Sequence, residues 1–254
     1  MKADLSGKLC LVTGASRGIG AAIATLLAGS GATIVIHYGS NKQAAEKIRS
    51  SLPGKAHSVL GADLSEPQAA VGCVKRVMEA HGRLDVLVNN AGIFTPHPPL
   101  HTDSEAWLDA WQETLSVNLL APALLCHAAA SVMAGQGGGR IINIGSRGAF
   151  RGEAEAPAYA ASKAGLHAMS QSLAVALAPQ NIQVFAVAPG FVETDMAKSL
   201  LAGPGGAAIR QQSPMNRVAA PHEVAEVVCF LAATEAAYMS GAIIDVNGAS
   251  YLRT

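Results

Sequence analysis

The chain has 254 residues, of which 50% are apolar and 14% are charged, so it can bury a large core. Its 18 acidic and 18 basic residues balance, which gives no support to nucleic-acid or membrane-surface binding. We expect a soluble cytoplasmic protein, because the N-terminal residues lack the apolar core of a signal peptide and no uninterrupted apolar run approaches the length of a membrane span. The four cysteines are far apart and form no C-x-x-C pair, which indicates reduced thiols.

Short apolar runs alternate with longer helical patterns along the whole chain. The expected strands are residues 8–13, 32–37, 57–60, 84–89, 140–144, 183–187 and 242–246. The expected helices are residues 19–29, 42–51, 66–81, 105–134, 158–178 and 221–233. Apolar strands joined by helical crossovers are typical of a parallel sheet that is buried on both faces. We therefore predict a single Rossmann-type, doubly wound α/β domain over residues 1–254, with about seven parallel strands and helices on both faces.

Residues 191–217 interrupt this alternation. They contain GPGG at 203–206 and several polar residues, and their helical pattern is weak. Long irregular insertions in compact domains are usually lids or binding loops, and in an open parallel sheet they lie outside the carboxyl ends of the strands. We predict a substrate-binding lid here in preference to a disordered surface excursion.

The first expected strand runs directly into TGASRGIG, which places glycines at positions 14, 18 and 20. Glycine permits a tight turn and a close approach of backbone to phosphate, and the N-terminus of the following helix offers unpaired N–H groups to an anion. A glycine cluster alone could be a plain strand–helix turn. Its place in the first βα unit favours a dinucleotide pyrophosphate site.

The end of the second strand predicts which dinucleotide is bound. An NAD site usually has an acidic residue there for the ribose 2′-hydroxyl, but this chain has HYGSNK at 37–42. Ser40 and Asn41 could bond a 2′-phosphate, and Arg17 could offset its charge. The alternative is that Arg17 and Lys42 are merely solvated. The pattern favours NADP.

Two further strand ends carry polar signals. Asp63 in GADL could accept a hydrogen bond from the adenine amino group, or could cap a helical segment that begins at Ser65. NNAG at 89–92 would let backbone approach a ligand, although a plain turn would look similar.

Taken together, the motifs give the chain a clear resemblance. From about Leu5 onward it resembles a short-chain dehydrogenase/reductase of the single-domain type, and within that family the 3-oxoacyl-[acyl-carrier-protein] reductases. The strings TGASRGIG, YAASKAG and APGFVETDM carry the subgroup resemblance. The family pattern is matched in order by TGASRGIG at 13–20, Asp63, NNAG at 89–92, Asn118, Ser146, YAASK at 159–163, and Pro189 and Gly190 with Thr194.

The resemblance assigns roles to four catalytic residues. Tyr159 would be the general acid/base, and Lys163, one helical turn away, would hold the nicotinamide ribose. Lys163 would also supply part of a lowering of the Tyr159 pKa, and an oxidised nicotinamide would add more. Lowering a tyrosine pKa from about 10 by roughly three units takes about 4 kcal/mol of preferential phenolate stabilisation. Ser146 would bond the substrate oxygen. Asn118 would position a water in a proton relay to Lys163; the alternative is a buried amide that satisfies a backbone group.

We expect NADP to be the cofactor and no metal to be bound, since His97 and His101 lie in a Pro-broken loop that would not hold ligands on one face. Pro189, Gly190, Val192 and Thr194 would hold the carboxamide end of the nicotinamide. The residues expected to bind the cofactor are Gly14, Ser16, Arg17, Gly18, Ile19, Gly20, Tyr38, Ser40, Asn41, Asp63, Leu64, Asn90, Ala91, Gly92, Tyr159, Lys163, Pro189, Gly190, Val192 and Thr194.

The resemblance implies an NADP(H)-dependent oxidoreductase that transfers a hydride between the nicotinamide and a carbonyl or alcohol substrate. That substrate would be a small molecule, with a 3-oxoacyl thioester or a carrier-bound acyl chain as a candidate. The alternative is a catalytically silent dinucleotide-binding sensor or scaffold. Such proteins typically lose the tyrosine or the lysine, and this chain retains Tyr159 and Lys163.

The loop between Ser146 and Tyr159 is unusually charged. Arg147 and Arg151 could meet an acidic group on a substrate or carrier, or could form ion pairs with Glu153 and Glu155. We expect the ion pairs.

The expected helices 105–134 and 158–178 are apolar or small around most of their circumference. A helix that packs only on a sheet needs one apolar stripe, so the surplus predicts a second buried face. Relatives commonly pair these two helices across a two-fold axis, and we expect a homotetramer built as a dimer of dimers.

Overall fold

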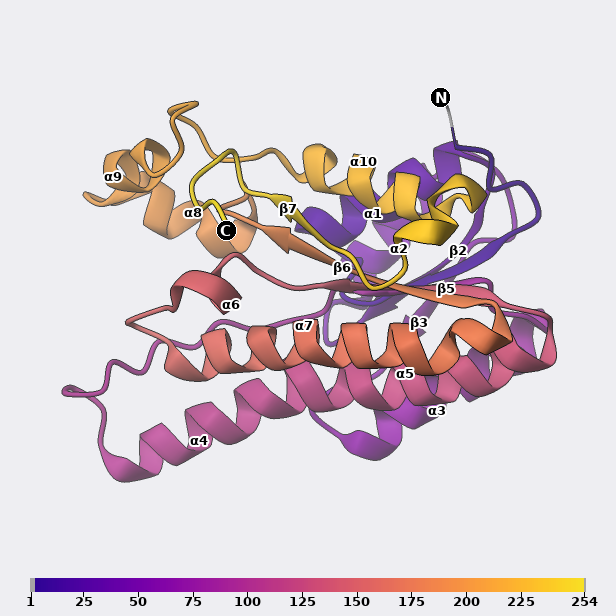
Figure 1. Cartoon of the computed structure of the whole chain (residues 1–254), viewed down its shortest axis with the longest axis horizontal. Coiled ribbons are helices and arrows are strands. Elements are labelled where there is room, and N and C mark those ends of the chain that lie inside the picture. The colour runs from indigo at the N-terminus through magenta and orange to yellow at the C-terminus, as the bar shows by residue number, and fades with distance from the viewer. Residues whose placement is uncertain (1–2, 254) are drawn as a thin grey trace.

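Figure 1 shows a computed structural model that describes residues 3–253, apart from the side chains of residues 196, 234 and 235. The described residues form one all-parallel, seven-stranded sheet in the order β3-β2-β1-β4-β5-β6-β7. The predicted doubly wound fold is confirmed. The strands are β1 Leu9–Val12, β2 Thr33–Tyr38, β3 Ser58–Gly61, β4 Val86–Asn89, β5 Gly139–Ile144, β6 Ile182–Pro189 and β7 Ile243–Val246.

Helices cover both faces of the sheet (Figure 1). One face carries α1 Gly18–Gly29, α2 Lys42–Ser51 and α10 Pro221–Ala232, and the other carries α3 Pro67–His81, α5 Ala121–Gly135 and α7 Pro157–Leu177. The remaining helices are α4 Ser104–Leu115, η1 Ser116–Leu120, α6 Gly148–Arg151, η2 Ala178–Gln180, α8 Asp195–Ala202, α9 Gly206–Gln211 and η3 Thr234–Met239.

The two faces have separate apolar cores, because successive strand residues point to opposite sides of the sheet. Val12 and Ile36 face α1 and α10, whereas Leu11 and Val35 face the layer of α3 and α5. Many of the buried helix residues in these cores are alanines, whose small side chains let the helices lie close to the sheet.

The expected helix 105–134 is not uniform. Its middle turn, η1, is a π-helical turn in which the Ala121 N–H donates to the Ser116 carbonyl, five residues back. Hydropathy does not encode this change of pitch, because the flanking residues stay apolar. The predicted lid at 191–217 contains two short helices, α8 and α9.

Among the described residues, one continuous helical stretch, Ser104–Gly135, is long and apolar enough to cross a membrane, with a mean hydropathy of 1.6 over its most apolar part. Buried residues make up 39% of that part. Several of them, including Leu125, Cys126 and Ala129, pack in the core beside the sheet. Core helices share this length and composition, so the stretch is weak evidence for a membrane span.

Candidate active site

A cleft of about 730 Å³ lies at the carboxyl ends of the strands, where the strand order reverses between β1 and β4. Doubly wound sheets bind their ligands at this position. Most of the predicted site residues line it. They are Gly14, Ser16, Arg17, Gly18, Ile19, Ser40, Asn41, Asp63, Leu64, Asn90, Ala91, Gly92, Ser146, Tyr159, Lys163, Pro189, Gly190, Val192 and Thr194.

Three predicted site residues lie behind the wall of the cleft. Tyr38 turns toward β3, where a Cβ on Gly61 would lie 2.7 Å from its hydroxyl oxygen, so the expected cofactor contact is not supported. Gly20 packs against the turn instead: a Cβ there would lie 2.5 Å from the Gly14 carbonyl oxygen. Asn118 is fully buried.

The glycine turn is braced by the strand next to it. Gly14 has a φ of +61°, and a Cβ there would lie 2.9 Å from the Ala91 Cα. The Asn90 side chain donates to the Thr13 and Gly14 carbonyls at 2.9 and 3.2 Å, and the Thr13 hydroxyl oxygen accepts from the N–H groups of Asn90 and Ala91. NNAG is therefore a second wall of the turn as well as part of the cleft.

Helix α1 begins directly after this turn. Its N-cap residue, Arg17, makes no side-chain cap hydrogen bond, and the first turn contains no acidic residue. The N–H groups at this helix end are therefore left to an external acceptor, which is the arrangement that binds phosphate.

A residue that the sequence analysis did not single out, His37, holds the turn from the other side. The Gly14 N–H donates to His37 Nδ1 at 3.1 Å, so Nε2 carries the proton and donates to the Ala62 carbonyl at 3.1 Å. Burial lowers the pKa of His37 to about 4, which keeps the ring neutral. The available signal was a histidine at the end of an apolar strand that faces a glycine turn.

Two polar side chains at the end of the cleft expected to bind the adenosine ribose already form hydrogen bonds within the protein. Asn41 is the N-cap of α2, where its Oδ1 accepts from the Ala44 N–H at 2.9 Å. Asp63 accepts from the N–H and hydroxyl of Ser65 at 2.9 and 2.7 Å, and these bonds lower its pKa. Since α3 begins at Pro67, Asp63 stabilises a local turn and does not cap that helix.

The predicted catalytic pair lies near the start of α7, and the loop before it fixes that helix end. His97 is buried, and its Nε2 accepts from the Ala158 N–H at 3.1 Å while its Nδ1 donates to the Thr95 carbonyl at 2.7 Å. The described residues contain no group of ligands that could hold a metal ion. His97 therefore positions the helix that carries Tyr159.

Lys163 and Tyr159 are both desolvated. The Lys163 ammonium donates to the Ile144 carbonyl at 2.8 Å, and burial lowers its pKa to about 8. Burial raises the pKa of the Tyr159 hydroxyl, its hydrogen bond with Ser146 opposes the rise, and Glu153 adds to it. The expected lowering of the Tyr159 pKa, by Lys163 together with an oxidised nicotinamide, stays a prediction for the protein with its cofactor bound.

Asn118 lies in the π-helical turn. Its Oδ1 accepts from the Ile93 N–H at 2.9 Å, and its Nδ2 donates to the Ile93 carbonyl at 3.0 Å and to the Ser162 hydroxyl at 3.2 Å. These bonds match the alternative reading, a buried amide that satisfies a backbone group. Gly92 lies against it, since a Cβ there would be 3.2 Å from Asn118 Oδ1 and 3.4 Å from Lys163 Nζ. A role in positioning water stays a prediction.

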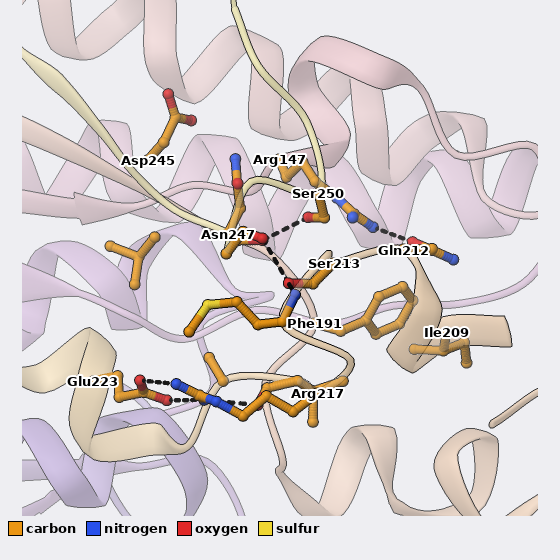
Figure 2. Close-up of a pocket in the computed structure, with 15 residues that line it drawn as sticks. Arg147, Phe191, Ile209, Gln212, Ser213, Arg217, Glu223, Asp245, Asn247 and Ser250 are labelled. Carbon is orange, nitrogen blue, oxygen red and sulfur yellow. Dashed lines mark hydrogen bonds and ion pairs between the residues drawn. The ribbon is translucent and has the colours of Figure 1, made fainter. Parts of the chain in front are cut away.

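The ion pairs expected in the charged loop are wrong. Arg147 and Arg151 both donate to the Gln212 side-chain oxygen, at 2.8 and 3.0 Å, and neither belongs to an ion pair formed by the described residues. The loop folds into α6, which turns both guanidinium groups toward the segment after α9 (Figure 2 shows Arg147 and Gln212).

Comparisons with known proteins agree with this geometry. Residues 14–249 match the family model described as enoyl-(acyl carrier protein) reductase. A 3-oxoacyl-[acyl-carrier-protein] reductase of Aquifex aeolicus is 40% identical over 99% of this chain and 100% of its own. A cis-4-hydroxycyclohexanecarboxylate dehydrogenase of Sinomonas cyclohexanicum is 37% identical over 95% of each.

A solved structure is similar over almost the whole chain. It is a crystal structure of a short chain dehydrogenase from Burkholderia cenocepacia in complex with NADP, with a TM-score of 0.88, 36% identity and coverage of 97% of this chain and 98% of its own. The chain therefore belongs to the short-chain dehydrogenase/reductase family of oxidoreductases.

Proposed function

We propose that the protein is an NADP(H)-dependent oxidoreductase that interconverts a carbonyl and an alcohol, with Ser146, Tyr159 and Lys163 as its catalytic residues. The observation that carries this proposal is the meeting of these three side chains with the glycine turn in one cleft. The relatives support the reaction class, and the Burkholderia neighbour supports NADP.

The residues present fit a dinucleotide. Gly14 and Gly18 have positive φ values, which open the backbone to a phosphate, and the N–H groups that begin α1 have no side-chain cap. Arg17 and Ser40 line the ribose end, where no carboxylate of β2 would repel a 2′-phosphate. The bound cofactor would supply or accept the hydride.

The chain's own residues would handle the oxygen and its proton. In the reductive direction, the Tyr159 hydroxyl donates its proton to the substrate oxygen. The Ser146 oxygen accepts from the Gly148 N–H at 2.9 Å, and its hydroxyl hydrogen, which bonds Tyr159 in this structure, would turn to the substrate oxygen when a substrate binds. With a pKa of about 8, Lys163 stays largely protonated near neutrality, so its positive charge stabilises a developing phenolate.

A 3-oxoacyl thioester is the substrate that the relatives favour, free or carrier-bound. Their names also include a cyclic hydroxy acid dehydrogenase, so family membership alone does not select the substrate. The test is NADPH oxidation with acetoacetyl thioesters, small diketones, keto acids, sugars and steroids in parallel. Turnover of at least one carbonyl is expected. NADPH binding without any turnover would favour the silent sensor.

A homotetramer and a cytoplasmic location complete the proposal. Leu108, Leu120 and Val175 are 54%, 44% and 80% exposed on α4, η1 and α7, the elements expected to form an interface. Light scattering at micromolar concentration should return about four times the chain mass of 25.9 kDa. A monomer mass would contradict the assembly.

A further inference from the structure

Arg147 follows the proposed catalytic Ser146 and is almost completely buried, with 2% of its surface exposed. Its backbone N–H donates to the Pro189 carbonyl at 2.9 Å, which fixes it between the ends of β5 and β6. Its guanidinium lies over the Phe191 ring, 5.4 Å from the centroid, and donates to Gln212 Oε1 (Figure 2). The charged group is therefore held in place by aromatic and amide contacts.

The charge of Arg147 is not matched by a bonded carboxylate, unlike that of its neighbours. Arg217 pairs with Glu223 at 2.6 and 2.7 Å, as Figure 2 shows, and Arg253 pairs with Asp245 at 2.8 Å. Among the described residues, no ion pair includes Arg147. A buried charge normally has a paired, hydrogen-bonded partner, because desolvation without one is expensive.

Two other charges act on this group. Arg151 shares the Gln212 oxygen with Arg147, and Glu153 is close enough to affect both arginines without bonding to them. Burial and Arg151 lower the pKa of Arg147, and Glu153 raises it. Two guanidinium groups and one carboxylate leave an excess of one positive charge, which a single anionic group would balance.

The position of Arg147 indicates where that anion comes from. Arg147 and Phe191 line both the catalytic cleft and a second cavity of about 180 Å³, which Gln212 also lines. Arg147 therefore lies where the catalytic cleft and the second cavity adjoin, and it follows Ser146, the residue proposed to bond the reacting oxygen, in the chain. A substrate substituent that displaced the Gln212 oxygen would meet the guanidinium at this boundary.

We propose that Arg147 binds a carboxylate of the substrate, so that the preferred substrates are keto acids and the corresponding hydroxy acids. The proposal rests on the proposed oxidoreductase function and names its substrate class. A carboxylate matches the planar guanidinium with two parallel hydrogen bonds and would replace the neutral Gln212 oxygen. A monoanion suits the local excess of one positive charge better than a phosphate dianion does.

The test compares each keto acid with its own methyl ester, which keeps the carbonyl and removes the charge. Acetoacetate and 4-oxocyclohexanecarboxylate are the acids. The wild type should have the higher kcat/KM for each acid. In Arg147→Gln the acid-to-ester ratio should fall on the order of tenfold to a hundredfold, the range that a hydrogen bond to a charged group supplies. A merely structural Arg147 would lower both values together and leave the ratio unchanged.

Two further variants sharpen the result. Gln212→Glu places a carboxylate of the chain itself on both arginines, so the acid-to-ester ratio should fall while the melting temperature rises. Arg147→Lys keeps the charge without the bidentate fork and should recover part of the ratio. The matched control is Arg210→Gln, which removes one positive charge from α9 at a residue that lines neither cavity, and it should keep the wild-type ratio.

The possible results distinguish a failure of the carboxylate-binding role of Arg147 from a failure of the proposed oxidoreductase function. Reduction of acetoacetyl thioester or of the esters in preference to the acids would overturn the role of Arg147 and leave the oxidoreductase intact. An unchanged ratio in Arg147→Gln would also overturn it. The absence of turnover with every carbonyl, with NADPH still bound, would overturn both proposals.

Discussion

The two ends of the cleft are built differently. At the end that begins with the glycine turn, the groups that face the ligand are mostly backbone, and hydrogen bonds of Thr13, His37 and Asn90 hold that backbone in place. At the other end, long side chains from the two ends of α6 and from the segment after α9 meet beside the cleft, where Arg147 and Arg151 share the neutral oxygen of Gln212.

The difference indicates which part of the site depends on the sheet and which part can vary without disturbing it. A site made of backbone is set by the strand order and the helix ends, so it suits a ligand that every member of a family shares. A site made of side chains on short helices can be altered without disturbing the sheet. Tyr159 lies between the two ends, on a long helix that belongs to the scaffold.

The largest effect on turnover is expected at Tyr159, between the two ends of the cleft. Tyr159→Phe keeps the ring and its edge contact with Phe94, at 5.1 Å between centroids, and removes only the proton-bearing oxygen. Turnover should fall by about 10²–10⁴-fold, the usual contribution of a general acid. NADPH affinity, measured by fluorescence titration, should stay close to that of the wild type. Residual turnover within a few-fold of the wild type would show that the proton comes from another group.

The fixed character of the cofactor end is tested by two glycines of one helix. In Gly20→Ala the new methyl group would lie 2.5 Å from the Gly14 carbonyl oxygen and the Asn90 amide nitrogen. The overpacking should lower the free energy of unfolding by about 1–3 kcal/mol and weaken NADPH binding. Urea denaturation and a cofactor titration would measure both.

Gly29→Ala is the matched control, because it adds the same methyl group to α1 where nothing lies within 4 Å. It should leave cofactor binding unchanged and stabilise the helix by up to about 1 kcal/mol. Equal losses in the two variants would mean that the turn tolerates the extra atom and is less rigid than the contacts imply.

The sequence predicted the cofactor end far better than the substrate end, for a physical reason. Glycines after a strand encode a backbone shape, and NNAG and PG do the same at neighbouring strands, so local pattern and global position agree. The partner of Arg147 is Gln212, 65 residues away, and its choice over Glu153 depends on how α6 and α9 turn. Nearby opposite charges in a sequence do not determine that geometry.

Two other misses have the same origin. Asn118 was singled out, but its π-helical turn was not expected, because a shift from four-residue to five-residue hydrogen bonding leaves the hydropathy pattern intact. His37 was overlooked because its hydrogen bonds run from β2 to Gly14 in the turn after β1 and to Ala62 after β3. In both cases the decisive partner is a backbone group that sequence patterns do not show.

The brace at His37 should make the cofactor end sensitive to acid. Burial holds the pKa of His37 at about 4, against 6.5 for an ordinary histidine, so the unfolded chain binds more protons between these values. Its contribution to stability is complete above about pH 6.5 and is lost as the pH falls toward 4. The loss from about pH 7 to about pH 5 should be about 2 kcal/mol for this group.

Urea denaturation of the wild type and His37→Asn at the two pH values measures this contribution. The variant should lose less stability on acidification than the wild type, whatever its stability at neutral pH. His167, whose pKa burial also lowers to about 4, supplies a second acid-sensitive contribution that both proteins retain. An identical acid dependence in the two proteins would mean that His37 is protonated without breaking its bond to Gly14.

The smallest effect is expected at the exposed rim of the cofactor end, where the charge of Arg17 is predicted to favour NADPH over NADH. Arg17 lines the cleft, is exposed, and belongs to none of the ion pairs among the described residues. The wild type should prefer NADPH to NADH, and Arg17→Gln should lower that preference only about twofold to tenfold, because solvent screens an exposed charge. The effect should shrink further at high salt.

Lys42→Gln is the matched control, because it removes an equal charge from the start of α2, outside the cleft, and it should change the preference less. Comparing kcat/KM for both cofactors at low and high salt measures these differences. A ratio that Arg17→Gln leaves untouched would show that Ser40 and the backbone alone select the cofactor. A wild-type preference for NADH would contradict the predicted selectivity itself.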